Sequence, residues 1–108
     1  MPQRRPAEEA GSPVKHTMYY SYVLYSLKTN RLYTGSTEDL KRRCKEHNNG
    51  EGGVYTKKNR PFILIHYEAF LSKKDAQRQE KFYKSGYGRE VLDDKISCSL
   101  DEIKNKRV

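Results

Sequence analysis

The sequence has 108 residues and a formal net charge of +8, and nearly all of the excess positive charge lies between residues 18 and 90. This length allows one small domain, and 34% hydrophobic residues allow a modest core. The chain has no apolar run near the length of a membrane span and no apolar middle of a secretory signal, while its basic centre suits a polyphosphate partner.

Residues 1–17 are polar and contain several prolines, so we expect a disordered leader there. Cys44 and Cys98 are too few and too far apart for a zinc site. Two thiols without a secretory signal fit a reducing compartment. We therefore expect a cytoplasmic protein that has no membrane partner.

Three runs of apolar and aromatic residues predict three strands. Residues 18–27 predict the first strand and residues 32–35 the second. The turn between them contains Asn30, which tolerates a positive φ, so the two strands form a hairpin. Residues 62–70 predict the third strand, and its continuous apolar start predicts a central strand buried on both faces.

Helix signals fill most of the remaining chain. The first predicted helix follows an N-cap at Ser36 or Thr37 and ends near residue 49. The second begins after a cap at Ser72 and stops before Gly86. A third helical stretch covers residues 89–95, and residues 50–60 are expected to form a polar loop.

These elements predict an α+β fold, with a small, mostly antiparallel three-stranded sheet and helices packed over it. The folded domain is expected to span residues 18–96. Residues 97–108 are expected to form a C-terminal tail or a short helix.

Two charged residues lie on the apolar faces of the predicted helices. The spacing of the first helix puts four residues on one face: Leu40, Arg43, Cys44 and His47. The second helix puts Glu80 on one face with Ala76 and Tyr83. A carboxylate is rarely buried without a partner or a metal. One interpretation is therefore structural, in which Arg43 and Glu80 form an ion pair that joins the two helices.

The ordered blocks of the chain also support a functional interpretation. Ser21-Tyr22-Val23 and Tyr33-Thr34-Gly35 lie on the predicted hairpin, and Arg43, His47 and Glu80 follow on the two helices. Together these residues, from about Tyr19 to Glu90, resemble the GIY-YIG nuclease family in its short single-domain branch. Ser21-Tyr22-Val23 stands at the first family motif and Tyr33-Thr34-Gly35 at the second.

The resemblance implies a divalent-metal-dependent endonuclease that hydrolyses DNA phosphodiester bonds, with branched or damaged DNA, as in DNA repair, as the candidate substrate. Glu80 stands where the family binds its metal, Mg²⁺ or Mn²⁺, and Arg43 where it binds phosphate. Tyr22 or Tyr33 would accept a proton from the attacking water, and His47 would assist. We expect Glu80, Arg43 and both tyrosine hydroxyls to line one cleft, within about 10 Å of one another.

The sequence departs from the family pattern at three points. Serine replaces the glycine of the first motif, at Ser21, and threonine replaces the isoleucine of the second, at Thr34. The family often has an asparagine about a dozen residues after the glutamate, whereas residues 89–93 contain none. This difference bears on the rate of catalysis more than on the fold.

A further group of residues suits contact with DNA. Basic side chains beside an aromatic ring can bind the phosphate backbone and stack on bases, although they can also form a solvated surface. The candidate DNA-binding residues are Tyr55, Lys57, Lys58, Arg60 and Arg42.

Two other classes stay open at this point. The chain can be a nucleic-acid-binding module on the same fold that has lost cleavage, or a basic RNA-binding protein with a structural ion pair. Besides DNA, the candidate partners are a second copy of the chain or a recruiting protein.

Overall fold

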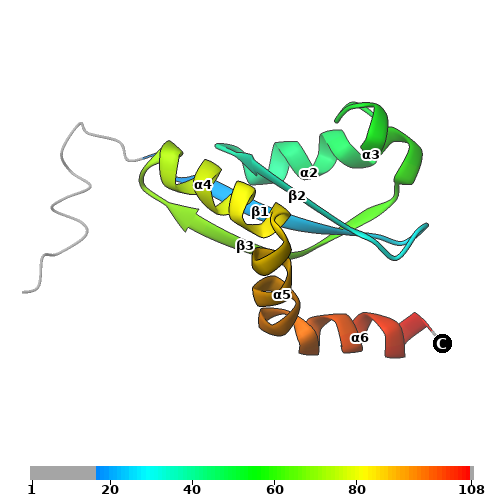
Figure 1. Ribbon diagram of the computed structural model, residues 1–108. Helices are drawn as coiled ribbons and strands as arrows, with labels where there is room; N and C mark the ends of the chain where they lie inside the picture. Colours follow the sequence, from blue (N-terminus) through cyan, green and yellow to red (C-terminus); the bar gives the residue numbers. More distant parts are fainter. Residues whose placement is uncertain (1–16, 108) are drawn as a thin grey trace, which may run out of the picture.

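The computed structural model describes residues 17–107, and the predicted leader lies outside these residues except for Thr17. Three strands, β1 (Tyr19–Ser26), β2 (Leu32–Thr37) and β3 (Phe62–Phe70), form one antiparallel sheet in the order β2-β1-β3 (Figure 1). The predicted α+β class with a small antiparallel three-stranded sheet is confirmed.

The central strand is β1, so the prediction that residues 62–70 form the central strand is wrong. All residues from Ser21 to Ser26 are buried, whereas Leu64 and Tyr67 of β3 are 39% and 52% exposed. Tyrosine can be buried because its ring is apolar and its hydroxyl needs only one partner. The tyrosine-rich β1 therefore takes the central place, and the more apolar β3 lies at an edge.

The hairpin follows its prediction. Asn30 adopts a φ of 63°, and the Tyr25 hydroxyl donates a hydrogen bond of 3.0 Å to its side-chain oxygen. A short polar side chain tolerates this left-handed conformation better than other non-glycine residues do. The turn thus fixes the register that pairs Tyr22 with Gly35.

The first helix, α2 (Leu40–Asn48), starts later than predicted. Its N-cap is Asp39, whose carboxylate accepts a hydrogen bond of 3.1 Å from the backbone N–H of Arg42. Ser36 and Thr37 instead belong to β2, because the ladder with β1 continues as far as Thr37. The predicted cap at these two residues is therefore wrong, and the strand is longer than expected.

The predicted polar loop contains a short helix, α3 (Val54–Asn59). The second predicted helix is α4 (Lys73–Lys84), with Ser72 as its N-cap. Gly86 does not merely stop this helix but begins the next one, α5 (Gly86–Lys95), and α6 (Ser97–Arg107) follows. None of the helices within residues 17–107 is long and apolar enough to cross a membrane.

The helices cover both faces of the sheet (Figure 1). On one face, Tyr22, Leu24 and Phe62 form a core with partly buried residues of α2. On the other face, Val23 packs with Tyr83 of α4 and with residues of α5. Because side chains alternate along a strand, consecutive residues of β1 or β2 point to opposite faces of the sheet. This alternation decides which face each candidate site residue occupies.

Candidate active site at the edge of strand β2

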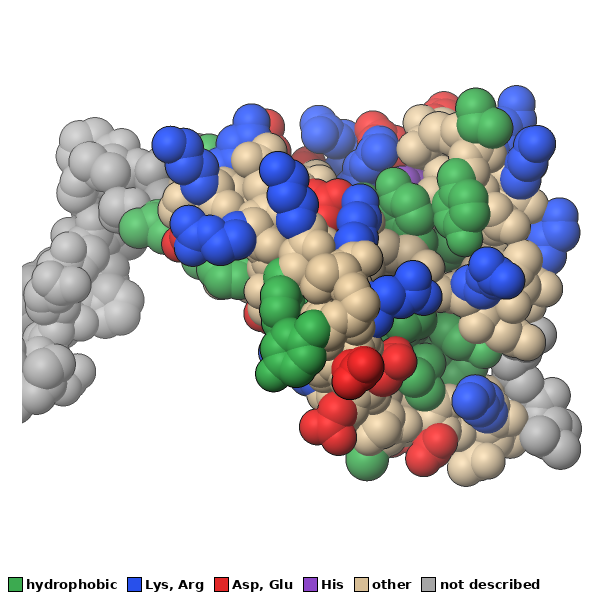
Figure 2. All heavy atoms as spheres, in the orientation of Figure 1, with side chains coloured by type: hydrophobic (Ala, Val, Ile, Leu, Met, Phe, Trp, Pro, Cys, Tyr) green, Lys and Arg blue, Asp and Glu red, His purple; other side chains and the backbone are tan. Residues whose placement is uncertain are grey.

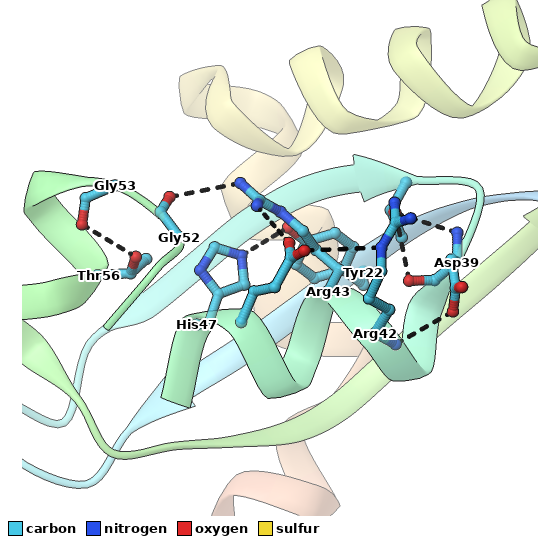
Figure 3. Close-up of polar contacts among 10 residues, drawn as sticks. Tyr22, Asp39, Arg42, Arg43, His47, Gly52, Gly53 and Thr56 are labelled. Atoms are coloured by element: carbon cyan, nitrogen blue, oxygen red, sulfur yellow. Dashed lines mark hydrogen bonds and ion pairs between the residues drawn. The ribbon is translucent and has the colours of Figure 1, made fainter. Parts of the chain in front are cut away.

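A buried tyrosine–histidine pair forms the centre of the site. The Tyr22 hydroxyl lies 2.8 Å from Nε2 of His47, and the two residues are 1% and 0% exposed (Figure 3). His47 reaches the sheet because α2 turns one face inward, as its helical spacing predicts. Leu40 and Cys44 of the same face pack against the core cluster that contains Tyr22.

Burial sets the protonation states of this pair. It raises the pKa of Tyr22 to about 12, although a hydrogen bond from Arg43 acts to lower it. Burial lowers the pKa of His47 to about 4, and the positive charge of Arg43 adds to this effect. Tyr22 is therefore a phenol and His47 a neutral imidazole at neutral pH. We infer that Tyr22 donates to Nε2, so that the ring proton of His47 lies on Nδ1.

That Nδ1 atom is buried and has no hydrogen-bond partner among residues 17–107. It faces Gly52, where even one additional Cβ atom would overlap the imidazole. A buried polar atom without a partner is costly and is more common at functional sites than elsewhere. The loop between α2 and α3 thus closes over His47 with a glycine because no larger residue fits there.

Arg43 lies beside the pair and is partly open to solvent. Its Nη1 donates to the Glu46 carboxylate at 2.9 Å, and its Nη2 donates to the Gly52 carbonyl at 3.3 Å (Figure 3). The hydrogen bond to Glu46 raises the pKa of Arg43, so the guanidinium is permanently charged. With its side chain 30% exposed, it is held in place and can still meet a phosphate.

The second motif tyrosine, Tyr33, lies in front of His47. The two rings meet edge-on with centroids 5.1 Å apart, and Tyr33 also stacks on Tyr55 of α3 with centroids 5.8 Å apart and an interplanar angle of 21°. Tyr33 and Tyr55 line a groove of about 260 Å³, together with Lys84 and Arg89 from the other side. The two motif tyrosines therefore differ, since Tyr22 is enclosed and Tyr33 faces a recess.

Glu80 lies on the opposite face of the sheet. Its Oε1 accepts a hydrogen bond of 2.8 Å from the Ser36 hydroxyl, and its Oε2 pairs with Nζ of Lys84 at 2.8 Å. The suggested Arg43–Glu80 ion pair is therefore wrong, because each charge has a different partner. Tyr22 and Glu80 therefore reach the edge of the sheet from its two faces, since Ser36 and Gly35 are consecutive in β2 and their side positions alternate. That all four groups line one cleft stays a prediction.

The candidate site has two halves, one around Tyr22 and one around Glu80, and they lie on the two sides of β2. Gly35 pairs with Tyr22 in the sheet, and a Cβ atom at Gly35 would overlap the Tyr22 hydroxyl. The next residue, Ser36, holds Glu80. Only the backbone of one edge strand thus lies between the Tyr22 hydroxyl and the residue that anchors Glu80. A substrate that wraps this edge can reach both halves.

Glu80 and Ser36 suit a divalent cation by the nature of their donors. Mg²⁺ prefers oxygen ligands and is often held by one carboxylate, waters and substrate phosphates. Within residues 17–107, no group of three or more His, Cys, Asp and Glu side chains could hold a metal ion. The partly exposed Glu80 therefore fits a one-carboxylate site that the substrate completes, and Lys84 would have to release it.

Of the five candidate DNA-binding residues, one lines the groove and the other four are outside its lining. Tyr55 lines it, and Lys57 and Lys58 are exposed on the same short helix. Arg60 follows this helix, and Arg42 is 60% exposed on α2, 3.6 Å from Glu46. Sequence reasoning missed four residues that contact the candidate site residues or line the groove beside them: Ser36, Gly52, Lys84 and Arg89.

Comparison with known proteins identifies one protein family and several similar proteins. Residues 18–93 match the model of the GIY-YIG catalytic domain. A UPF0213 protein of Pediococcus acidilactici is 42% identical over 76 residues, which cover 68% of this chain and 76% of the relative. A UPF0213 protein of Streptococcus agalactiae is 46% identical over 65 residues, which cover 60% of this chain and 73% of the relative.

Among solved structures, the solution NMR structure of the UPF0213 protein BH0048 from Bacillus halodurans is 40% identical, with a TM-score of 0.43 over 69% of this chain and 81% of that protein. The names of these relatives state no activity, so the family model alone carries the functional implication. A GIY-YIG domain implies nuclease chemistry in general, with DNA as the substrate and a divalent metal as the usual cofactor. The chain belongs to the GIY-YIG family.

Proposed function

We propose that the protein is a divalent-metal-dependent endonuclease, using Mg²⁺ or Mn²⁺, that hydrolyses DNA phosphodiester bonds at the edge of β2, with branched or damaged DNA as its substrate. The observation that carries this proposal is the buried Tyr22–His47 hydrogen bond beside the partly exposed Arg43. Such a group of one phenol, one imidazole and one guanidinium has the parts for phosphate binding and proton transfer.

Arg43 is assigned the role of binding the scissile phosphate. A guanidinium fits two phosphate oxygens and stabilises the negative charge that builds in the transition state. Its contacts to Glu46 and the Gly52 carbonyl leave part of the group exposed, so a phosphate can bind without breaking them. Bound metal would add positive charge at Glu80 on the other side of the strand.

Tyr22 is assigned the role of accepting the proton of the attacking water. His47 is assigned the role of holding the Tyr22 hydroxyl in place. A phenol accepts a proton only after it has lost its own proton to the solvent, and with a pKa of about 12 Tyr22 keeps its proton in the free protein at neutral pH. Arg43 already lowers this pKa, and further positive charge acts in the same direction. Because His47 has a pKa of about 4, it holds the hydroxyl without taking its proton.

A cleavage assay tests this function. Purified protein is incubated with supercoiled plasmid and with branched DNA, in Mg²⁺, in Mn²⁺ and in a chelator. We expect metal-dependent nicks that disappear in Glu80→Ala, while DNA binding persists because many Lys and Arg side chains carry it. The matched control is Glu90→Ala, which removes an exposed carboxylate on α5. Cleavage by Glu80→Ala at the rate of the unmodified protein would show that Glu80 has no role in it.

A binding module without cleavage is the second candidate. The ion pair between Lys84 and Glu80 favours it, because it occupies the carboxylate that a metal would need. The same assay separates the two functions. The binding module predicts retention of plasmid on the protein and no nicks in any metal.

A further inference from the structure

The groove beside the active site is longer than the catalytic chemistry requires. A second recess of about 250 Å³ adjoins it and shares three lining residues with it: Leu32, Arg89 and Asp93. The second recess continues past Arg31 of the hairpin to Lys104 of α6. Figure 2 shows a hollow between the part that holds the sheet and the α5–α6 segment, with hydrophobic side chains in it and Lys and Arg side chains at its rim. We call the two recesses together the edge groove.

One end of the edge groove carries an aromatic stack. Tyr33 is held by the ring of His47, and Tyr55 stacks on Tyr33 and is 47% exposed. The two rings line the same recess. An exposed tyrosine face is a platform for a nucleobase, but the bases inside a duplex already have neighbours on both faces. The stack therefore fits an unpaired base better than a base pair.

The charge along the edge groove is mainly positive. Four cations line it, Arg31, Lys84, Arg89 and Lys104, against the single carboxylate of Asp93. Lys84 is paired with Glu80, but no carboxylate of residues 17–107 forms an ion pair with the other three. All four cations are exposed. Unpaired cations that follow a groove suit a chain of phosphates.

We propose that the edge groove binds an unpaired strand of DNA, with one base on Tyr55 and the backbone running past Arg89 toward Arg31 and Lys104. This inference rests on the proposed nuclease function and names its substrate. The cleaved bond lies next to a single-stranded segment. An acidic peptide would meet the same cations, but it has no base to use the aromatic stack.

Binding measured in a chelator tests the groove without cleavage. A fluorescent oligo(dT) of about ten nucleotides and a blunt hairpin of the same length are titrated and followed by anisotropy. We expect tighter binding of the single strand. Tyr55→Ala should weaken it by about fivefold or more, whereas Tyr55→Phe, which keeps the ring, should bind like the unmodified protein.

The charged half of the groove is tested with a double variant, Arg31→Ala with Lys104→Ala. It should weaken single-strand binding by about tenfold and change hairpin binding by less than about threefold. The matched control is the double variant Arg78→Ala with Lys74→Ala, which removes the same charge from exposed positions on α4 outside the groove. Thermal melts show that each variant is folded.

Two results overturn the groove assignment: equal or tighter binding of the hairpin by the unmodified protein, or equal losses in the two double variants. A different result would overturn the nuclease proposal. Single-strand binding at the groove without cleavage of any DNA in Mg²⁺ or Mn²⁺ supports the groove and overturns the nuclease. Cleavage of duplex DNA at the same rate with or without a single-stranded arm overturns the groove and supports the nuclease.

Discussion

Two polar networks in this protein use similar residues and differ in how completely their hydrogen bonds are satisfied. The first is the candidate active site at the edge of β2. The second, which we call the Glu68 network, lies on the α4 face of β3 and comprises Glu68, Tyr83, His66, Gln79 and Lys95. Each contains a tyrosine, a histidine and a cation, so residue type alone does not separate them.

In the Glu68 network the carboxylate is surrounded by donors. Glu68 accepts from the Tyr83 hydroxyl, from Gln79 at 2.9 Å and from His66 at 2.9 Å, while Lys95 donates to the Tyr83 oxygen at 2.8 Å. Burial alone would raise the pKa of Glu68, but these hydrogen bonds outweigh it and lower the pKa to about 2. A fully satisfied network of this kind stabilises the fold.

At the edge of β2 the bonding is incomplete. Nδ1 of His47 has no partner among the described residues, the pKa of Tyr22 is raised, and Arg43 is 30% exposed. The exposed part of Arg43 can still bind a ligand, whereas the donors around Glu68 are already occupied by its carboxylate. Under the proposed function, the first network binds substrate and the second stabilises the fold.

The largest expected effect is on Tyr22. Tyr22→Phe removes the proposed proton acceptor and should lower the single-turnover cleavage rate by about 10²–10⁴-fold. Tyr33→Phe keeps the ring that faces the groove and should cost less than about tenfold. Rates at saturating enzyme on a branched substrate measure both. A larger loss in Tyr33→Phe would reverse the two assignments.

Arg43→Ala should lower the cleavage rate by about 10²–10³-fold, because it removes a positive charge from the transition state. Its thermal midpoint should change by only a few degrees, since the ion pair with Glu46 is partly exposed and worth about 1 kcal/mol or less. Arg78→Ala, on the outside of α4, is the control for loss of charge. If Arg43→Ala melts far below the unmodified protein, Arg43 is a structural residue.

The change of the cleavage rate with pH should be smaller than the effects of these two substitutions. The pKa of Tyr22 is raised to about 12, so its ionised fraction grows about tenfold with each pH unit below that value. We expect the rate to rise steeply between about pH 7 and about pH 9. A flat profile over that range, with the chemical step limiting, would show that no phenol ionises in the reaction.

The smallest effect concerns stability in acid. The folded pKa of Glu68, about 2, lies below its ordinary value of 4.5, so between these values the unfolded chain binds more protons at this position. The stabilisation by Glu68 is complete above about pH 5 and is lost as the pH falls toward 2. Thermal melts should show this loss in the unmodified protein and not in Glu68→Gln. An equal loss in both would assign the acid sensitivity to other groups.

The parts of the fold that depend on neighbouring residues could be predicted from the sequence. The turn at Asn30 and the inward face of α2 follow from local geometry, because φ preference and helical spacing act over a few residues. Helix α3 was missed because it is short and lies among glycines, where propensity gives little signal.

The parts that depend on distant residues could not be predicted in the same way. The Tyr22–His47 bond joins residues 25 apart, and the Ser36–Glu80 bond joins residues 44 apart. The family resemblance named three of these residues, Tyr22, His47 and Glu80, but not Ser36. It could not place them on the two faces of β2, because strand order is decided by which strand buries more of its surface and not by the apolar pattern of one strand.

The most direct test compares two isosteric changes, Glu80→Gln and Glu68→Gln, by cleavage rate and thermal midpoint under the same conditions at neutral pH. We predict that Glu80→Gln loses cleavage by about 10²-fold or more and melts like the unmodified protein. Glu68→Gln should cleave normally below its melting temperature and lose about 1–3 kcal/mol of stability, at roughly 4–8 °C per kcal/mol. Normal cleavage by Glu80→Gln, or loss of cleavage in fully folded Glu68→Gln, would contradict the division between a catalytic edge at β2 and a structural network at β3.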